Sequence, residues 1–432
     1  MRNRILTACL ILSSALLSSR LPAQDIDKII NPTEVENIEK VLSADDMQGR
    51  RPFTPGIEKA ADFIEAQFRA AGLQSWNNSG SYRQPFSMIR AKKLYQTGDL
   101  DGVQVSGENI IAVYSAQPHL EINENSGYEK VYVKAGDAPS SLYKHTQALK
   151  NRIVFVDTSF SRNFSRLATP GRPSFASAVN VVFILTAKEP AHYTIKIDQE
   201  ITEQKLANVV GILPGRSKEK EFVIFSGHYD HLGIGKPDAK GDSIYNGAND
   251  DASGTTAVIM LARYFAQRQD NERTLIFATF TAEEMGGFGS QYFSRQFDPG
   301  AVAAMFNIEM IGTESKWGTN SAYITGYERT DMGKILEKNL EGSPFRFYPD
   351  PYPTEQLFYR SDNATLARQG VPAHTLSTSK MDSEKYYHKQ GDEIGTLDMN
   401  NMAQVIKSVA VSSRSIVAGK DTPSRVDTSQ LR

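Results

Sequence analysis

The sequence predicts an α/β protein built on a doubly wound mixed sheet, with a helical N-terminal segment and a β-rich insert. Apolar strand-like runs alternate with amphipathic helix-like runs over residues 208–417, which is typical of βαβ units around a mostly parallel sheet. Residues 57–71 carry apolar side chains at helical spacing. Short β-branched runs separated by turn residues fill residues 91–203 and indicate the insert.

The individual elements follow from the same patterns in chain order. Asn31-Pro32 is a typical helix start, and the helix expected over 57–71 follows it. The expected insert strands are residues 109–114, 130–133, 152–157 and 179–185. Beyond the insert we expect strands at 208–213, 221–226, 274–280, 302–308 and 372–376, and helices at 252–267, 328–340, 364–369 and 402–417.

The N-terminal residues 1–23 have the pattern of a secretory signal peptide. Arg2 and Arg4 precede a mostly apolar run at 5–17, and cleavage is expected after Ala23. The run is too short to cross a bilayer, so we expect an exported protein, periplasmic or secreted, without a stable membrane span. The mature chain is then a discontinuous domain at residues 24–90 and 204–419, the insert at 91–203, and a polar tail at 420–432 that should fray.

Composition excludes several functional classes. The 432 residues include 48 basic and 50 acidic side chains, a net charge of −2, with no basic block, so nucleic acid is not an expected partner. Cys9 is the only cysteine and falls in the signal peptide. Cysteine nucleophiles, zinc-thiolate sites and iron–sulfur clusters are therefore not expected in the mature protein.

Acidic and imidazole side chains occur where the predicted strands end. His228 and Asp230 follow one apolar run, Glu283-Glu284 follow the next, and Glu309 ends a third. In an open α/β sheet these ends form the ligand-binding edge, where several acids would repel one another unless cations lay among them. Imidazole and carboxylate ligands without thiolates suit zinc, cobalt or manganese.

A site with two ions needs one bridging carboxylate, and Asp250 is the natural candidate. Asp250 and Asp251 precede a predicted helix, so either could instead cap it, and Asp251 is expected to act as a helix N-terminal charge. His228, Glu284, Glu309 and one more group would complete the ligands. Of the adjacent Glu283 and Glu284, only one can readily point at the ions, while its neighbour contacts the water bound at the site.

The motifs occur in the order found in a known family. The chain resembles the co-catalytic zinc exopeptidases of the M28 aminopeptidase type over about residues 204–419, in His228-Tyr-Asp230, Asn249-Asp250-Asp251-Ala-Ser-Gly254, Ala282-Glu283-Glu284, Asn307-Ile-Glu309-Met and Tyr387-His388. Met47-Gln-Gly-Arg-Arg51 and Thr54-Pro-Gly56 resemble the family's opening. The resemblance implies a sheet of the zinc exopeptidase type and two divalent metal ions, with zinc expected.

The resemblance also implies a role for each site residue. His228 and Glu309 would bind one ion, Glu284 and His388 the other, and Asp250 would bridge them. Glu283 would be the general base, Asp230 would accept the second ring N–H of His228, and Tyr387 would help to hold the oxyanion. The remaining histidines occupy no motif position and are expected to be ordinary surface or core residues: His119, His145, His192, His231 and His374.

The expected activity is hydrolysis of peptide bonds at chain ends through a metal-bridging water, acting on peptides or small amino-acid derivatives as an aminopeptidase. Glu309 stands where many family aminopeptidases have Asp, and Glu there is similar to carboxypeptidases of the same clan, so carboxypeptidase activity is an alternative. A glutaminyl cyclase-like enzyme and a non-catalytic binding ectodomain are two further alternatives, although this chain keeps a metal-ligand residue at every position where the family has one.

Two further features limit what the resemblance implies. Ser361-Asp362-Asn363 replaces a more familiar Ser-Asp-His near the substrate side, so substrate preference does not transfer. Residues 151–157 and 176–183 resemble parts of a protease-associated domain, a module that interrupts such peptidases. The oligomeric state is left open by the sequence.

Overall fold

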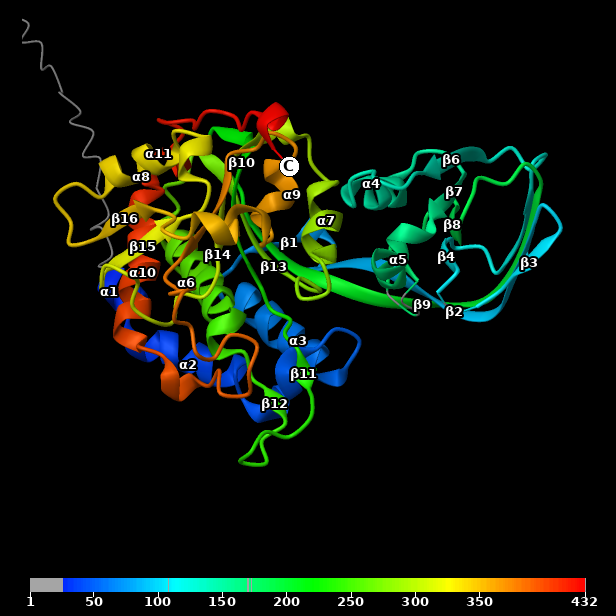
Figure 1. Ribbon diagram of the computed structural model, residues 1–432. Helices are drawn as coiled ribbons and strands as arrows, with labels where there is room; N and C mark the ends of the chain where they lie inside the picture. Colours follow the sequence, from blue (N-terminus) through cyan, green and yellow to red (C-terminus); the bar gives the residue numbers. More distant parts are fainter. Residues whose placement is uncertain (1–25, 108, 169–170, 172, 432) are drawn as a thin grey trace, which may run out of the picture.

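A computed structural model describes residues 26–431 except 108, 169–170 and 172; the predicted signal peptide and Cys9 lie outside the described residues. The main sheet is mixed and has the strand order β16-β15-β17-β14-β10-β13-β9-β2-β3, with β1 and β5 also paired to β9 (Figure 1). Its strands are β1 (Gln74–Ser75), β2 (Arg83–Leu100), β3 (Val103–Val105), β5 (His119–Asn123), β9 (Tyr193–Leu213), β10 (Lys218–His228), β13 (Arg273–Phe280), β14 (Val302–Ile308), β15 (Ser321–Ile324), β16 (Arg346–Pro349) and β17 (Ala373–Ser377).

Helices cover both faces of the central strands, which confirms the doubly wound arrangement (Figure 1). Along β10, Val223 and Phe225 pack on one face and Ile224 on the other, so the strand is buried on both sides. The first face carries α2 (Pro32–Leu42), α3 (Pro55–Ala70), α6 (Ser253–Arg268), α8 (Met332–Asn339) and α10 (Met399–Ser412), and the second carries α7 (Phe288–Ser294) and α9 (Asn363–Ala367).

Helix ends follow local capping chemistry. α2 begins where Asn31-Pro32 predicts, because the Asn31 Oδ1 atom accepts the Glu34 N–H at 3.1 Å. α10 begins three residues earlier than expected, since the Asp398 carboxylate accepts the Asn401 N–H at 3.0 Å. The predicted last helix also divides at Ser413 into α10 and a short α11 (Arg414–Val417). A four-residue helix, α1 (Ile26–Ile29), precedes α2.

The insert is a separate sheet layer beside the main sheet. Its strands are β4 (Ile111–Tyr114), β6 (Glu129–Val133), β7 (Arg152–Asp157) and β8 (Val181–Thr186), in the order β4-β8-β7-β6, close to the four predicted runs. One face packs against β5 and the far ends of β2 and β9, and the other against α4 (Ser140–Tyr143) and α5 (Ser161–Leu167). Figure 1 shows this layer at one side of the molecule.

The predicted boundaries of the insert, at residues 90/91 and 203/204, lie inside two long strands. β2 and β9 pair antiparallel from Arg83↔Val209 to Leu100↔Tyr193, so both cross from the main sheet into the insert. The register shifts once, between Lys93 and Tyr95. The insert thus consists of this separate four-stranded sheet packed on an extension of the main-sheet strands β2 and β9.

The polar C-terminal segment does not fray as expected. The Arg425 guanidinium donates to the carbonyls of Val302 and Pro299, both at 2.8 Å, and Val426 is buried. Arg273 donates to the carbonyl of Asp421 at 2.7 Å. Main-chain carbonyls at the edge of the core thus hold a segment whose own sequence is polar. Across the part of the chain that the structure describes, none of the helices combines the length and the apolar character needed to cross a membrane.

Candidate metal centre

The predicted strand-end residues converge because their strands are neighbours. β10 pairs in parallel with β13 and with β14, with His228 opposite Phe280 and Ser226 opposite Asn307. Glu309 follows the end of β14 directly, and Glu283-Glu284 follow the end of β13 after two residues. All of these side chains therefore emerge at one edge of the sheet.

The first cluster consists of His228, Asp250 and Glu309, whose ligand atoms all lie within 4.8 Å of one another. The Nε2 atom of His228 is 3.2 Å from Oδ1 of Asp250. The Nδ1 atom of His228 lies 3.1 Å from the main-chain carbonyl of Asp230, which leaves Nε2 free to bind an ion.

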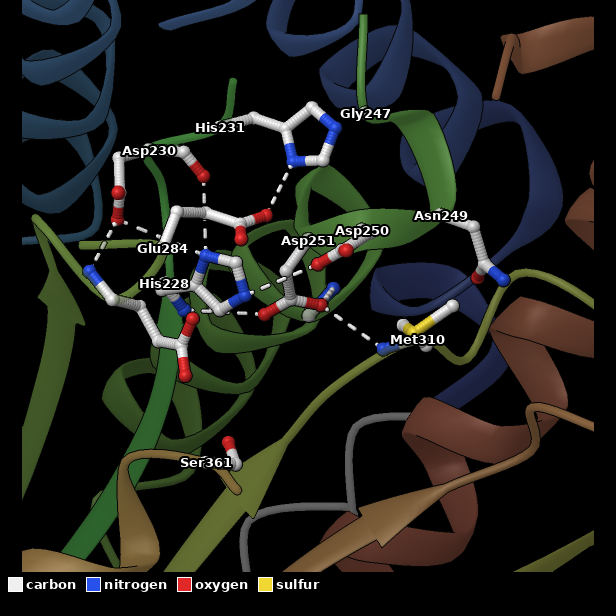
Figure 2. A network of polar contacts seen from close by, with 12 residues as sticks. His228, Asp230, His231, Gly247, Asn249, Asp250, Asp251, Glu284, Met310 and Ser361 are labelled. Carbon is white, nitrogen blue, oxygen red and sulfur yellow. Dashed lines mark hydrogen bonds and ion pairs between the residues drawn. The ribbon is translucent and has the colours of Figure 1, made fainter. Parts of the chain in front are cut away.

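The second cluster uses the other oxygen of Asp250. The Nε2 atom of His388 is 3.3 Å from Oδ2 of Asp250 and 3.1 Å from Oε2 of Glu284. A third imidazole, His231, lies with Nδ1 2.8 Å from Oε1 of Glu284, although His231 was expected to be an ordinary residue. Figure 2 shows the side chains of His228, His231, Asp250 and Glu284 turned toward a common space. Asp250 thus contacts both clusters.

The donor set fits divalent metal ions. Several buried atoms have no hydrogen-bond partner, among them Nε2 of His228, Oε1 of Glu284, Oε2 of Glu309 and both ring nitrogens of His231. Unpartnered polar atoms are costly to bury, and ions bound between them would remove that cost. Nitrogen and carboxylate oxygen donors without sulfur are typical of catalytic zinc sites.

Electrostatics separates the two adjacent glutamates. Burial raises the pKa of Glu283 well above its usual range, and the carboxylates of Glu309 and Asp362 act in the same direction. Burial would also raise the pKa of Glu284, but the nearby imidazoles of His231 and His388 lower it overall. Adjacent carboxyls whose pKa values move apart suit different roles, a proton carrier and a ligand.

Asp230 reaches the site differently from the expectation. Its carboxylate lies 3.8 Å from Nδ1 of His228, farther than its main-chain carbonyl, which is at 3.1 Å. The carboxylate Oδ1 instead accepts the N–H of Glu283 at 3.0 Å. The Asp230 side chain therefore fixes the main chain at Glu283, and its carbonyl orients His228.

A further layer of polar contacts, which the motifs did not indicate, holds the loop that carries Asp250. The Asp392 carboxylate accepts the N–H groups of Asn249 and Asp250 at 2.8 and 3.0 Å. The buried guanidinium of Arg50 donates to four main-chain carbonyls, at Leu42, Tyr229, Asn246 and Gly247. Arg50 lies in the predicted opening motif, and its contacts give that motif a structural role.

Tyr387 lies at the open side of the site. Its ring stacks on His388 with centroids 3.9 Å apart, and burial raises the pKa of its hydroxyl, which stays protonated at neutral pH. A small cavity of about 40 Å³ beside it is lined by Glu309, Met310 and Arg360 among others. Tyr387 therefore lines this cavity next to His388, with a hydroxyl that can donate a hydrogen bond.

The segment that carries these residues is similar to known proteins. Residues 208–412 match the model of peptidase family M28. The chain contains a peptidase family M28 domain. The M28 domain includes all eight predicted site residues, His228, Asp230, Asp250, Glu283, Glu284, Glu309, Tyr387 and His388, and it begins after the insert.

Among curated proteins, a probable zinc metalloprotease of Pyrenophora teres f. teres is 35% identical over 109 residues, which cover 25% of this chain and 23% of that protein. Leucine aminopeptidase 1 of Ajellomyces dermatitidis is 28% identical over 217 residues, which cover 46% of this chain and 53% of the relative. The match thus spans about half or less of these relatives' own length.

Two solved structures share the fold. An aminopeptidase from Aneurinibacillus sp. strain AM-1 aligns with a TM-score of 0.53 and 19% identity over 94% of this chain and 98% of its own. BSAP, a zinc aminopeptidase from Bacillus subtilis, aligns with a TM-score of 0.53 and 15% identity over 91% of this chain and 97% of its own. These likenesses confirm the predicted fold class for the M28 domain.

The M28 domain departs from the expected Ser-Asp-His at Asn363. The Asn363 amide donates to the carbonyls of Phe358 and Ala373 at 3.0 and 3.3 Å, and its oxygen accepts from the Thr375 hydroxyl at 2.8 Å. Asn363 therefore anchors its segment to β17. The neighbouring Ser361 hydroxyl accepts from the Asn307 amide at 2.7 Å, close to the ligand-bearing end of β14.

Proposed function

We propose that this protein is a zinc-dependent exopeptidase that uses two metal ions and acts as an aminopeptidase on peptides or small amino-acid derivatives. The observation that carries the proposal is the position of Asp250, whose two carboxylate oxygens lie 3.2 Å from His228 Nε2 and 3.3 Å from His388 Nε2. A carboxylate placed between two ligand clusters is suited to bridge two ions.

Bound ions would supply Lewis acidity and lower the pKa of water at the cleft. Glu283 then takes a proton from the attacking water and returns it to the leaving amine. The high pKa of Glu283, caused by burial, suits a group that must hold a proton during the reaction. The protonated hydroxyl of Tyr387 donates to the oxyanion that develops on the scissile carbonyl.

The experiment is a matched pair of substitutions in neighbouring positions. Glu283→Gln keeps the side-chain shape but cannot accept a proton, so kcat should fall by ~10² to 10⁴-fold while metal per chain stays at the wild-type value. Glu284→Gln should lose metal as well as rate. Metal analysis and kcat on a panel of aminoacyl reporter peptides provide the measurements.

An active Glu283→Gln enzyme, or one that loses metal while Glu284→Gln retains it, would contradict these roles. A wild-type chain that binds divalent metal but hydrolyses none of the reporters would favour a binding ectodomain instead.

A carboxypeptidase is the second candidate, because Arg360 lines the cavity beside Glu309 and offers a positive charge. Arg360 is also paired with Glu355 at 3.1 Å, and both side chains are exposed, so its charge is partly offset. Peptides blocked at one end separate the two activities: an aminopeptidase cleaves only those with a free amino group. Arg360→Gln should raise KM only for substrates that need a free carboxylate.

We propose that the protein is exported, on the basis of residues 1–23. Expression with residues 1–23 intact should yield a chain that begins near Gln24, as measured by mass spectrometry of the fraction outside the cytoplasm. A full-length chain retained in the cytoplasm would contradict export.

A further inference from the structure

His231 is a buried imidazole for which neither the sequence motifs nor the proposed mechanism provides a role. It lies three residues after His228, is fully buried, and has no hydrogen-bond partner at either ring nitrogen. A neutral imidazole has one donor and one acceptor nitrogen, so burial with both unpartnered is unfavourable. His374, another fully buried imidazole, shows the usual solution: its ring nitrogens bond to Thr330 and Thr325, both at 2.8 Å.

The position of the His231 ring is fixed by its surroundings. Its main-chain N–H donates to the carbonyl of Arg50 at 3.2 Å. Gly247 lies against the ring, and a Cβ atom at Gly247 would come within 2.5 Å of His231 Cδ2. Arg50 in turn holds the Gly247 carbonyl at 2.9 Å. The ring therefore has little space to turn away from the site.

A predicted metal ligand lies beside the His231 ring. Nδ1 lies 2.8 Å from Oε1 of Glu284, yet neither atom forms a hydrogen bond there, so the contact lacks the alignment of a donor and an acceptor. Two ligands of one zinc ion, each about 2.0–2.1 Å from it, lie about 2.8–3.0 Å apart at a right angle and about 3.3–3.4 Å apart at the tetrahedral angle, so 2.8 Å is at the short end of this range. The contact therefore has the spacing of two ligands that face a common ion.

The second imidazole of this cluster fits the same ion. The rings of His231 and His388 have centroids 5.8 Å apart and planes inclined at 67°. Two imidazoles on one zinc have centroids no more than about 6.4 Å apart, since each centroid lies about 3.2 Å from the metal. Asp250 completes the set, because ligand atoms of His231, Asp250 and Glu284 all lie within 4.8 Å of one another.

We propose that His231 is a further metal ligand that binds the second ion through Nδ1, together with Asp250, Glu284 and His388. This inference rests on the proposed two-ion function. It gives the second ion two imidazoles and the first ion only His228. The second ion should therefore be held more tightly, and a chelator should remove the first ion before the second.

The test compares His231→Leu, His231→Asn and a matched control, His374→Asn. Zinc per chain and the dissociation constant of each ion are measured by competition with a chromophoric chelator. Loss of the ligand should weaken the second ion by at least about 10-fold in both His231 variants. His374→Asn should leave both constants unchanged even if it lowers the melting temperature, because His374 lies outside the clusters.

His231→Asn distinguishes a ligand from a positioning residue. The Asn amide nitrogen occupies nearly the place of Nδ1 and can donate to Glu284, but it does not bind zinc. Wild-type affinity in His231→Asn would show that His231 acts only as a hydrogen-bond donor and would overturn the proposal. Unchanged affinity in both variants would overturn it as well.

X-ray absorption at the zinc edge of the wild-type protein provides a measurement that does not depend on variants that fold. With His231 bound, three imidazoles serve two ions, an average of 1.5 for each; without it the average is 1.0. An average near 1.0 with two ions bound overturns this inference and leaves the proposed function standing. A wild-type chain that binds no zinc overturns both.

Discussion

The Oδ2 atom of Asp251 accepts a hydrogen bond from the main-chain N–H of His228 at 3.1 Å. The other oxygen, Oδ1, accepts the N–H groups of Gly254 and Met310, both at 3.0 Å. The contact with Gly254 places Asp251 at the N-terminus of α6, where it was expected to act. The other two connect the end of β10 and the segment after β14, so one carboxylate joins three ligand-bearing segments.

Asp251→Asn should destabilise the protein. The side-chain NH₂ group of the new Asn would face a main-chain N–H that donates to a carboxylate oxygen in the wild type. Leaving that N–H unsatisfied costs about 1–3 kcal/mol, which urea unfolding can measure. Zinc affinity should fall too. Asp298→Asn is the matched control: Asp298 caps an exposed turn through Gly300 at 2.9 Å, and Asn is an equally good cap. Equal losses in both variants would contradict the cross-linking role.

Asp250→Ala should remove both ions, because the bridging carboxylate contacts both clusters. Glu309→Ala belongs to the first cluster alone and should leave about one ion per chain bound. Metal analysis after gel filtration gives both values. Full metal content and activity in Asp250→Ala would show that the bridge is assigned wrongly.

The insert histidines should be dispensable for metal binding, since each has a partner within the insert. His119 contacts Asp198 at 2.7 Å, and His192 contacts Glu124 at 2.8 Å. His145 contacts Arg152 at 2.9 Å. Replacing each histidine by Asn should leave zinc per chain at the wild-type value. Loss of an ion from any of these variants would place the insert in the metal site.

Glu39 should make stability depend on pH. Burial raises the pKa of Glu39 from 4.5 to about 8, while Oε2 accepts from the Thr256 hydroxyl at 2.8 Å. Between these values the unfolded chain releases a proton that the folded chain keeps. The free energy of unfolding therefore falls as pH rises through this window, by at most about 1.4 kcal/mol per pH unit, and levels off above pH 8.

Glu39→Gln removes this titration and keeps an oxygen for Thr256. Relative to wild type, the variant should gain stability steadily from pH 5 to pH 8. Urea unfolding of both proteins after treatment with a chelator measures the difference without a contribution from metal. Parallel pH profiles would mean that Glu39 titrates alike in the folded and unfolded chains.

Sequence patterns locate the site residues that end strands. His228 and Glu309 each follow an apolar run, and parallel neighbouring strands bring such ends together whatever the surrounding details. His388 is different, because it lies in a loop with a positive φ of 57° and no local periodicity marks it. Its predicted role came from the family resemblance alone.

The sequence does not reveal side chains whose roles depend on distant partners. His231 contacts Glu284 across 53 positions of chain, and Asp392 reaches the Asn249 N–H across 143. His231 adjoins a recognised motif, so its position could have indicated it. Asp392 has no such neighbour. The ordered tail was missed for a related reason: the carbonyls that hold Arg425 belong to residues 299 and 302.

The junction between the main sheet and the insert lies within the paired strands β2 and β9. This pairing restricts how the insert can be exchanged between relatives. A replacement joined at Ile89↔Glu203 must enter both strands in matching register. A slip of one residue in the pairing of β2 with β9 would turn the buried side chains of Phe86 and Met88 to the opposite face of the sheet. Exchange of the insert at this junction therefore tolerates changes in the outer loops of the insert far more readily than the insertion or deletion of one residue in either strand.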